Sequence, residues 1–236
     1  MYTHTVSAHH GSQWIVEGWA LFRVRPAVWV ALGAIDLVVT VLLSMIPVIS
    51  DLTPVFTVLW AGGMCAAAEN CRTLGTVRVA DAFNGIRRHA QPLFAASLVA
   101  LAAALVCDFA ASRMAASFNA LALATPGAAS ASAPWLAALL YAVAVIGAAL
   151  TLWLAPALIV LERMPPLDAL KASAVATWRN PLAALVYGVF IAGLAGAALV
   201  TLGIGLIVLA PLAYLSTFAA YRDLFANRRT GADTPA

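Results

Sequence analysis

Residues 176–190 read ATWRNPLAALVYGVF, in which a tryptophan, an arginine, an asparagine and a proline stand directly before a long apolar run. A similar order occurs twice earlier in the chain, as LFRVRPAVWVAL from Leu21 and as IRRHAQPLFAAS from Ile86. Proline suits the first turn of a helix, because its fixed φ is close to the helical value and its missing N–H would have no partner there. The three stretches therefore predict three long helices, each of which begins at a basic elbow.

The composition excludes an ordinary water-soluble domain. The chain has 236 residues, of which 64% are hydrophobic and 10% charged, whereas soluble domains average about 25% charged residues. The mean hydropathy is +0.95. Since so few polar residues cannot cover a folded surface, the solvent of this chain must be lipid. We expect no cleavable leader, because the N-terminus is polar to about Gln13 and no small-residue cleavage site follows the first apolar run.

Six segments reach the roughly 20 apolar residues that a membrane-spanning helix needs. The expected spans are Pro26–Val48, Thr53–Cys71, Pro92–Ala110, Trp135–Leu161, Pro181–Leu202 and Gly203–Leu224. The last two form one uncharged stretch that would be about 60 Å long as a helix, so we expect a turn at Gly203 and Gly205. The predicted fold is all-α: a polytopic membrane protein with six transmembrane helices in three hairpins, each preceded by a short cytoplasmic interfacial helix.

Lysine and arginine gather on one side of these spans. With the N-terminus inside, twelve of the thirteen basic residues fall at cytoplasmic ends, and Arg113 alone falls outside. This asymmetry is typical of bacterial membrane proteins, whose cytoplasmic loops are the positive ones. We therefore expect a protein of the bacterial inner (cytoplasmic) membrane with both termini in the cytoplasm. Polar tails, 1–13 and 226–236, flank the six-helix domain, 14–225.

Each elbow follows a short segment with apolar residues at helical spacing, such as Trp14, Leu21 and Phe22 before the first elbow. We expect these segments to lie at the membrane interface, with aromatic rings at headgroup depth. Three units of interfacial helix, elbow and hairpin would run in the same sense and form a parallel repeat. The connection 111–134 is expected to be a surface loop.

Small residues recur every four positions in the fifth apolar segment, at Gly193, Ala197 and Thr201. Such faces let helices approach closely, and we expect them to pack within the chain, with a homodimer seam as the alternative. A lone proline in the fourth segment, Pro156, is either a tolerated kink or a break of the kind found in transporters. The histidines at positions 4, 9 and 10 are assigned to the polar tail.

The segment LAPALIVLERMPPLDALKASAVATWRNPLAALVYG, followed by GLIVLAPLAYLSTFAAYRDLF, resembles a group of proteobacterial six-helix inner-membrane proteins. The N-terminal WIVEGWALFRVRPAVWV is similar to the same group. A more distant similarity extends to YciC-type membrane proteins and to the membrane domain of some glycerophosphodiester phosphodiesterases. The resemblance implies an architecture but no catalytic residue, and the phosphodiesterase domain has no counterpart in this sequence.

Asp36 is the most informative single residue, because it falls about ten residues into the first span, near the membrane midplane. A carboxyl at that depth costs roughly 2.5–3.5 kcal/mol to insert. We expect Trp60, Thr151 and Tyr214 at a similar depth, so these four residues form a candidate intramembrane polar site. Two roles stay open for Asp36: a protonated carboxyl in an interhelical hydrogen bond, or part of a proton or cation relay.

The basic elbows form a second candidate site for anionic lipid headgroups. Helix N-termini and arginines both favour anions, although the same charges also set the topology. The candidate headgroup contacts are Arg23, Arg25, Arg87, Arg88 and Arg179.

No phosphate loop, nucleophile elbow, zinc motif or carboxylate pair appears in the sequence, so we expect no enzyme, no cofactor and no metal. The first hypothesis is a non-enzymatic accessory, scaffold or lipid-interacting protein. Its expected partners are membrane lipids, anionic ones included, and a second copy or another membrane protein, with no nucleic acid. The alternative is a small permease or carrier for a lipid or amphiphile with Asp36 in its pathway. A tightly packed core favours the first hypothesis, and a cavity that reaches Asp36 favours the second.

Overall fold

The computed structural model describes residues 4–123 and 134–225, and within those ranges the chain is all-helical, without a strand. Its helices in chain order are α1 (His10–Val24), α2 (Pro26–Ser44), α3 (Pro47–Ser50), α4 (Thr53–Leu74), α5 (Val79–Arg88), α6 (Ala90–Leu123), α7 (Pro134–Leu152), α8 (Ala155–Leu161), α9 (Pro166–Arg179), α10 (Pro181–Val200) and α11 (Leu206–Phe225). The predicted elbows are present as single residues between helices, namely Arg25, His89 and Asn180.

Within the described ranges, four helices are long and apolar enough to cross a membrane: Pro26–Ser44, Ala90–Ala116, Trp135–Leu161 and Pro181–Val200. The chain is therefore a multi-pass membrane protein. Helices α4 and α11 are of similar length but end in polar residues, Glu69 to Arg72 in the first and Arg222 with Asp223 in the second.

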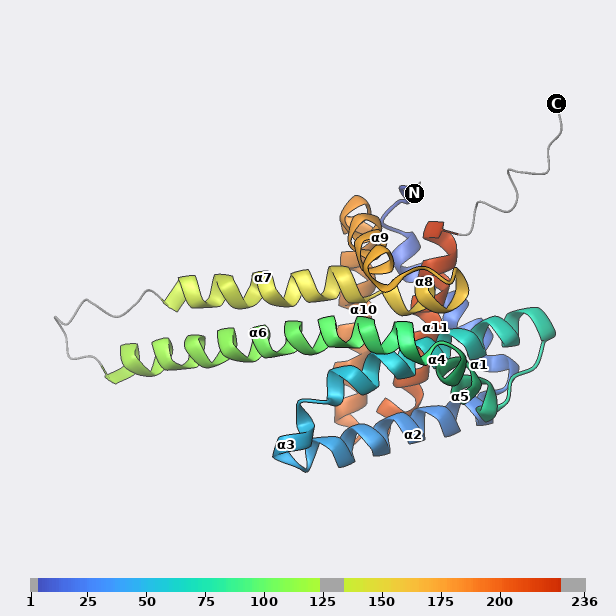
Figure 1. Cartoon of the computed structure of the whole chain (residues 1–236), viewed down its shortest axis with the longest axis horizontal. Helices are drawn as coiled ribbons and strands as arrows, with labels where there is room; N and C mark the ends of the chain where they lie inside the picture. Colours follow the sequence, from blue (N-terminus) through green and yellow to red (C-terminus); the bar gives the residue numbers. More distant parts are fainter. Residues whose placement is uncertain (1–3, 124–133, 226–236) are drawn as a thin grey trace.

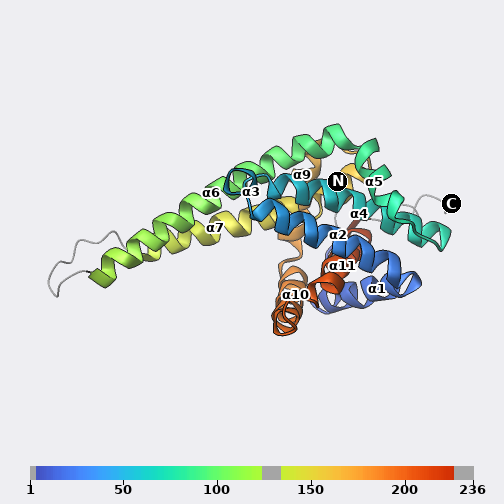
Figure 2. The same ribbon diagram turned by 90° about the horizontal axis from the view of Figure 1, so that it is seen from below.

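Helices α2, α4, α6 and α7 lie along the long axis of the molecule (Figure 1). The connection α3 lies where α2 and α4 join, α6 and α7 extend well beyond it, and α5 lies toward the opposite end together with the start of α2. The pair α10–α11 runs across this direction, and Figure 2 shows α10 nearly end-on. The third hairpin thus departs from the parallel repeat that the sequence predicts, because α11 packs on α1 and α2 more extensively than on α10.

Glycines permit the closest helix contacts. A Cβ added to Gly18 of α1 would lie 2.8 Å from the Ser216 nitrogen of α11, and one added to Gly33 of α2 would strike the Ile207 carbonyl. In the same way, Gly63 of α4 faces the Ala82 carbonyl of α5 at 2.6 Å. Backbones that approach this closely leave no room for a side chain, so these contacts fix which faces of the helices meet.

The first interfacial helix differs from the prediction. Trp14 and Phe22 are 1% and 5% exposed, because α1 packs against α10 and α11 rather than presenting its rings to headgroups. Residues 4–13, assigned to a tail, are also part of the fold: α1 begins at His10, and the Val6 N–H donates to the Asn180 side chain at 2.7 Å. The predicted disorder of the first three histidines is therefore wrong for His4, His9 and His10.

Two boundaries also differ. Helix α6 continues to Leu123, so residues 111–123 are helical rather than part of a surface loop; residues 124–133 of that predicted loop lie outside the described part of the chain. At about 1.5 Å per residue, the 34 residues of α6 are about 51 Å long, well beyond the hydrocarbon thickness. The predicted turn between α10 and α11 is present, with Gly203 at φ +82°.

The small residues of α10 are not packed within the chain as expected. A Cβ added at Gly188, Gly193 or Gly196 would meet nothing within 4 Å. The prediction of intramolecular packing is therefore wrong for Gly193, whereas Gly62 and Gly63 of α4 do face neighbouring helices, α6 and α5.

Candidate functional site

A large apolar groove lies between α4, α6, α7, α10 and α11. Its volume is about 1300 Å³, above the roughly 300–1,000 Å³ of a typical small-molecule pocket. Nine of its thirty lining residues are alanine or glycine, which are too small to fill the space between the helices. These small lining residues are Ala61, Ala100, Ala103, Ala104, Ala148, Ala149, Ala184, Gly188 and Ala192.

The groove has polar residues toward both ends. Thr53 at the start of α4 and Asp108 far along α6 line one end, and Thr177 and Trp178 at the close of α9 line the other. The side chain of Trp178 is 74% exposed. The groove thus has an apolar middle between two polar ends.

The helix that lines the groove from the α7 side is broken. Helix α7 ends at Leu152 and α8 begins at Ala155, with Pro156 in the first turn of α8. A break at this depth leaves backbone groups without helical partners, which is costly in lipid. Ser173 of α9 repairs the break, because its Oγ accepts the Leu154 N–H at 3.1 Å and donates to the Leu150 carbonyl at 3.0 Å. Of the two roles left open for Pro156, the structure shows a break.

Beside the break, a cluster of aromatic side chains with hydrogen-bonding groups lines the groove, through Trp153 and Tyr187. Trp153 stacks on Tyr187 with ring centroids 5.1 Å apart, and its Nε1–H donates to the Thr217 hydroxyl at 3.1 Å. The Tyr187 hydroxyl lies 2.9 Å from the Ser216 Oγ. Trp14 completes the cluster, 5.7 Å from Trp153. Hydrogen-bonded aromatic side chains hold this wall in place between α1, α10 and α11.

Asp36 and Tyr214 are brought together as a hydrogen-bonded pair between α2 and α11. Tyr214 also lines the groove, whereas Asp36 stands behind it and is half-buried. The groove therefore approaches Asp36 through its tyrosine partner. This is an interhelical hydrogen bond of the kind expected for an intramembrane carboxyl.

The other two members of the predicted polar site lie elsewhere. Trp60 is 1% exposed and packs between Phe56 and Phe83, and its Nε1 has no hydrogen-bond partner in the described structure. Thr151 donates back to the Gly147 carbonyl of its own helix at 2.8 Å. Equal depth in the membrane did not bring these side chains to Asp36, because depth alone does not specify which helix faces meet.

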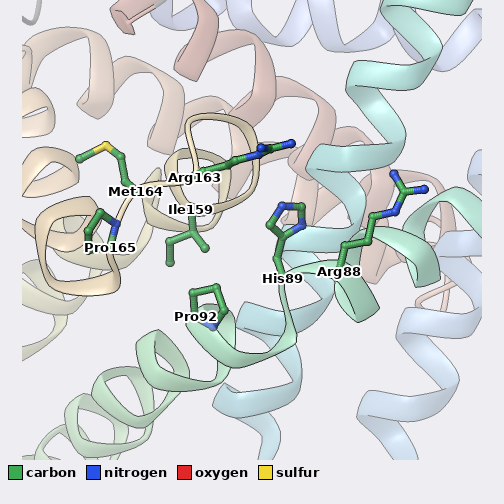
Figure 3. A pocket seen from close by; sticks show the side chains of 7 residues that line it. All are labelled: Arg88, His89, Pro92, Ile159, Arg163, Met164 and Pro165. Atoms are coloured by element: carbon green, nitrogen blue, oxygen red, sulfur yellow. The ribbon is translucent and has the colours of Figure 1, made fainter.

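The five elbow arginines are exposed, and they divide among three elbows. Arg23 and Arg25 lie beside the start of α2, Arg87 and Arg88 beside α6, and Arg179 beside α10. Of the five, Arg88 lines a second pocket, whose lining also includes His89 and Arg163 (Figure 3). The position of Arg163 in this pocket could not be predicted from the sequence, because the contact between α8 and α6 joins segments that are distant along the chain.

Two further polar positions were missed from the sequence. Asp223 of α11 accepts from the Trp14 Nε1–H at 2.8 Å and pairs with His10 Nδ1 at 2.7 Å. Asn180, the asparagine of the opening stretch, is 3% exposed and donates to the His4 and Ala176 carbonyls. The pairing of a polar elbow residue with an N-terminal segment more than 170 positions away left no signal in the local pattern.

Among curated proteins, the chain is similar to a protein of Burkholderia thailandensis named a "probable inner membrane protein", with 28% identity over 96% of this chain and 95% of that protein. No protein-family model matches the chain, and no solved structure matches it. The likeness to YciC-type proteins and to phosphodiesterase membrane domains therefore stays a prediction. The near full-length similarity and the apolar helices together support a multi-pass protein of the inner membrane.

Proposed function

We propose that this protein is a non-enzymatic, lipid-interacting protein of the inner membrane that holds an acyl chain of a membrane lipid in the groove between α4, α6, α7, α10 and α11. The groove is the observation that carries the proposal. Its wall is apolar and its small residues leave about 1300 Å³ unfilled, which contrasts with the dense packing of protein interiors.

The occupant follows from the surroundings of the groove. The outer faces of the helices that form it carry exposed apolar side chains, among them Phe109 and Leu140, which are 67% and 57% exposed. In a membrane these faces are in contact with lipid tails. An acyl chain is therefore at hand and matches the wall, whereas a water-soluble ligand would leave most of the wall without a favourable contact.

The test compares two double variants of α10. Gly188→Phe with Ala192→Phe places two rings in the groove, where Gly188 has open space. Gly193→Phe with Ala197→Phe is the matched control, because Gly193 has equal space and neither residue lines the groove. Native mass spectrometry of gently extracted protein should show retained lipid in the wild type and in the control, and a loss of most of it in the groove variant.

Other results would count against the proposal. Equal lipid retention in both variants, or none in the wild type, would mean that the groove holds no acyl chain. A second copy or another membrane protein in the spectrum, displaced by the groove variant, would make the groove a protein interface instead.

A carrier for a lipid or amphiphile is the second candidate, and two observations favour it. The break between α7 and α8 borders the groove, as broken helices border substrate sites in transporters. Tyr214 connects the groove to Asp36. In this case Asp36→Asn should abolish movement of a fluorescent lipid across proteoliposome membranes while leaving lipid retention unchanged. Unchanged movement in Asp36→Asn would leave the aspartate a structural role.

For the topology, we propose that α4 and α11 span the membrane as well, giving six spans with both termini inside. Charge distribution supports this. With six spans, twelve of the thirteen basic residues are cytoplasmic. With only the four most apolar helices as spans, six basic residues would lie inside and seven outside, and the positive-inside asymmetry would be lost. In a cysteine-free background, a membrane-impermeant maleimide applied outside should label Asp51→Cys and not Arg78→Cys. Equal labelling would favour four spans.

A further inference from the structure

The second pocket lies where the start of α6 meets the link between α8 and α9, apart from the acyl-chain groove. Its volume is about 570 Å³. Its lining residues are Arg88, His89, Pro92, Ile159, Arg163, Met164 and Pro165. Figure 3 shows the basic side chains of Arg88, His89 and Arg163 on one side and the apolar residues Met164, Pro165, Ile159 and Pro92 on the other. One rim of the pocket is thus cationic and the other is apolar.

The cations of this pocket are not neutralised by the protein. None of its seven lining residues is acidic, and within residues 4–123 and 134–225 no ion pair involves Arg88 or Arg163. Arg72, in contrast, is held by Glu69 of its own helix at 2.7 Å. The His89 Nδ1 lies 3.1 Å from the Gly85 carbonyl, so Nδ1–H donates there, and Nε2 can donate to a phosphate oxygen when the imidazole is protonated.

The backbone presents Arg163 at some conformational cost. Its φ is +52°, a left-handed value that helix ends usually give to glycine. The Met164 N–H donates to the Leu158 carbonyl at 3.3 Å and closes the turn around it. An arginine at a position that suits glycine is accounted for if its guanidinium has a use in the pocket.

From this geometry we infer that Arg88, His89 and Arg163 form a binding site for a phosphate group, carried either by a lipid headgroup or by a small soluble phosphate ester. Guanidinium groups bind phosphate oxygens through paired, charge-assisted hydrogen bonds. The apolar rim gives the remainder of such a ligand a surface to rest on. Helix α8 joins the two sites, since Pro156 lines the groove and Ile159, one turn later, lines the phosphate pocket.

The test uses the full chain in a non-lipid detergent and titrates three probes: a short-chain phosphatidylglycerol, diacylglycerol of the same chain length, and glycerol 3-phosphate. The phosphate-bearing lipid should bind and diacylglycerol should bind at least tenfold more weakly. Arg88→Gln combined with Arg163→Gln should lower the affinity at least tenfold. Lys171→Gln is the control, because Lys171 is an exposed cation on the neighbouring helix α9 and does not line the pocket; its affinity should stay within about twofold of the wild type.

The source of the phosphate follows from the third probe. Binding of glycerol 3-phosphate with an affinity near that of the lipid identifies a soluble phosphate ester, and binding of the lipid alone identifies a headgroup. Equal losses of affinity in Lys171→Gln and in the double variant would show that only the overall positive charge of the protein matters, and would overturn the site. So would equal binding of diacylglycerol and phosphatidylglycerol.

Two further variants separate this inference from folding and from the groove. Arg163→Gly removes the guanidinium and suits the left-handed turn, so it should weaken binding of the phosphate-bearing probe while keeping or raising the melting temperature. Gly188→Phe with Ala192→Phe fills the groove, and it should leave unchanged the ratio between the affinities for phosphatidylglycerol and for diacylglycerol. A phosphate site that persists in the groove variant would stand even if the acyl-chain proposal failed.

Discussion

Helices α1, α2, α4, α5 and α11 form a closely packed region, and α6, α7 and α10 border an open one, although both regions are rich in glycine and alanine. In the first region Gly18, Gly33 and Gly63 each face the backbone of a neighbouring helix. In the second, Gly188, Gly193 and Gly196 face open space. Small residues thus permit close approach without causing it. The difference lies in what each glycine faces: Gly18, Gly33 and Gly63 face a neighbouring helix, whereas Gly188, Gly193 and Gly196 lie on faces of α10 that no other helix covers.

The largest expected effect comes from disrupting the closed region at one of its close glycine contacts, that of Gly18 with the backbone of Ser216. Gly18→Leu would place a Cβ 2.8 Å from the Ser216 nitrogen, and backbone atoms cannot move aside as a flexible side chain does. We expect a loss at or above the upper end of the roughly 1–3 kcal/mol that overpacking costs. Gly193→Leu, in open space, is the control and should melt within a few degrees of the wild type. Thermal unfolding in detergent measures both, and equal melting temperatures would contradict the comparison.

The next largest effect is expected at the polar clamp of the closed region, in which Asp223 of α11 binds Trp14 and His10 of α1. Asp223→Ala removes the acceptor that the Trp14 indole and His10 share. Because Trp14 is 1% exposed, its Nε1–H would be left buried and unpaired, at a cost of about 1–3 kcal/mol. Asp168→Ala, at an exposed carboxylate on α9, should change the melting temperature little. If the two variants melt alike, the clamp does not hold α1 on α11.

A smaller effect is expected at the border between the two regions. Ser173→Ala leaves the Leu154 N–H and the Leu150 carbonyl without their side-chain partner at the helix break, and we expect about 1–2 kcal/mol of destabilisation. Ser97→Ala is a well-matched control, because Ser97 is also fully buried but donates only to Phe94 of its own helix, at 2.7 Å. Hydrogen exchange at residues 150–158 should rise in the first variant and not in the second. An unchanged exchange rate in Ser173→Ala would mean that the Ser173 hydrogen bonds do not stabilise the helix break.

The smallest effect is expected at Trp60, a buried side chain inside the closed region. Trp60 is fully buried, yet its Nε1–H has no hydrogen-bond partner within the described residues. Trp60→Phe removes this unpaired donor and also removes some ring volume, so the two contributions oppose each other. We expect a net change within about 1 kcal/mol in the free energy of unfolding. A loss of 3 kcal/mol or more would show that the indole makes contacts beyond simple packing.

Much of the secondary structure could be predicted from the sequence. Proline at Pro26 and Pro181 and the apolar runs behind them predict α2 and α10 with their first residues correct. The continuation of α6 past Ala110 could not be predicted in the same way, because residues 111–123 are rich in alanine and serine, a composition compatible with either helix or loop. The candidate polar site was only half recovered, since Tyr214 meets Asp36 but Trp60 and Thr151 face other neighbours.

The sequence by itself determined that this is an all-helical membrane protein with basic elbows, because hydropathy, charge placement and proline positions act locally along the chain. Only the tertiary structure decided which helix faces meet. It placed α11 across α1 and α2, left a groove beside α10, and brought Arg163 to Arg88 and His89. These outcomes depend on contacts between residues that are distant in sequence, and in lipid such contacts are chosen by shape and hydrogen bonding rather than by hydrophobicity.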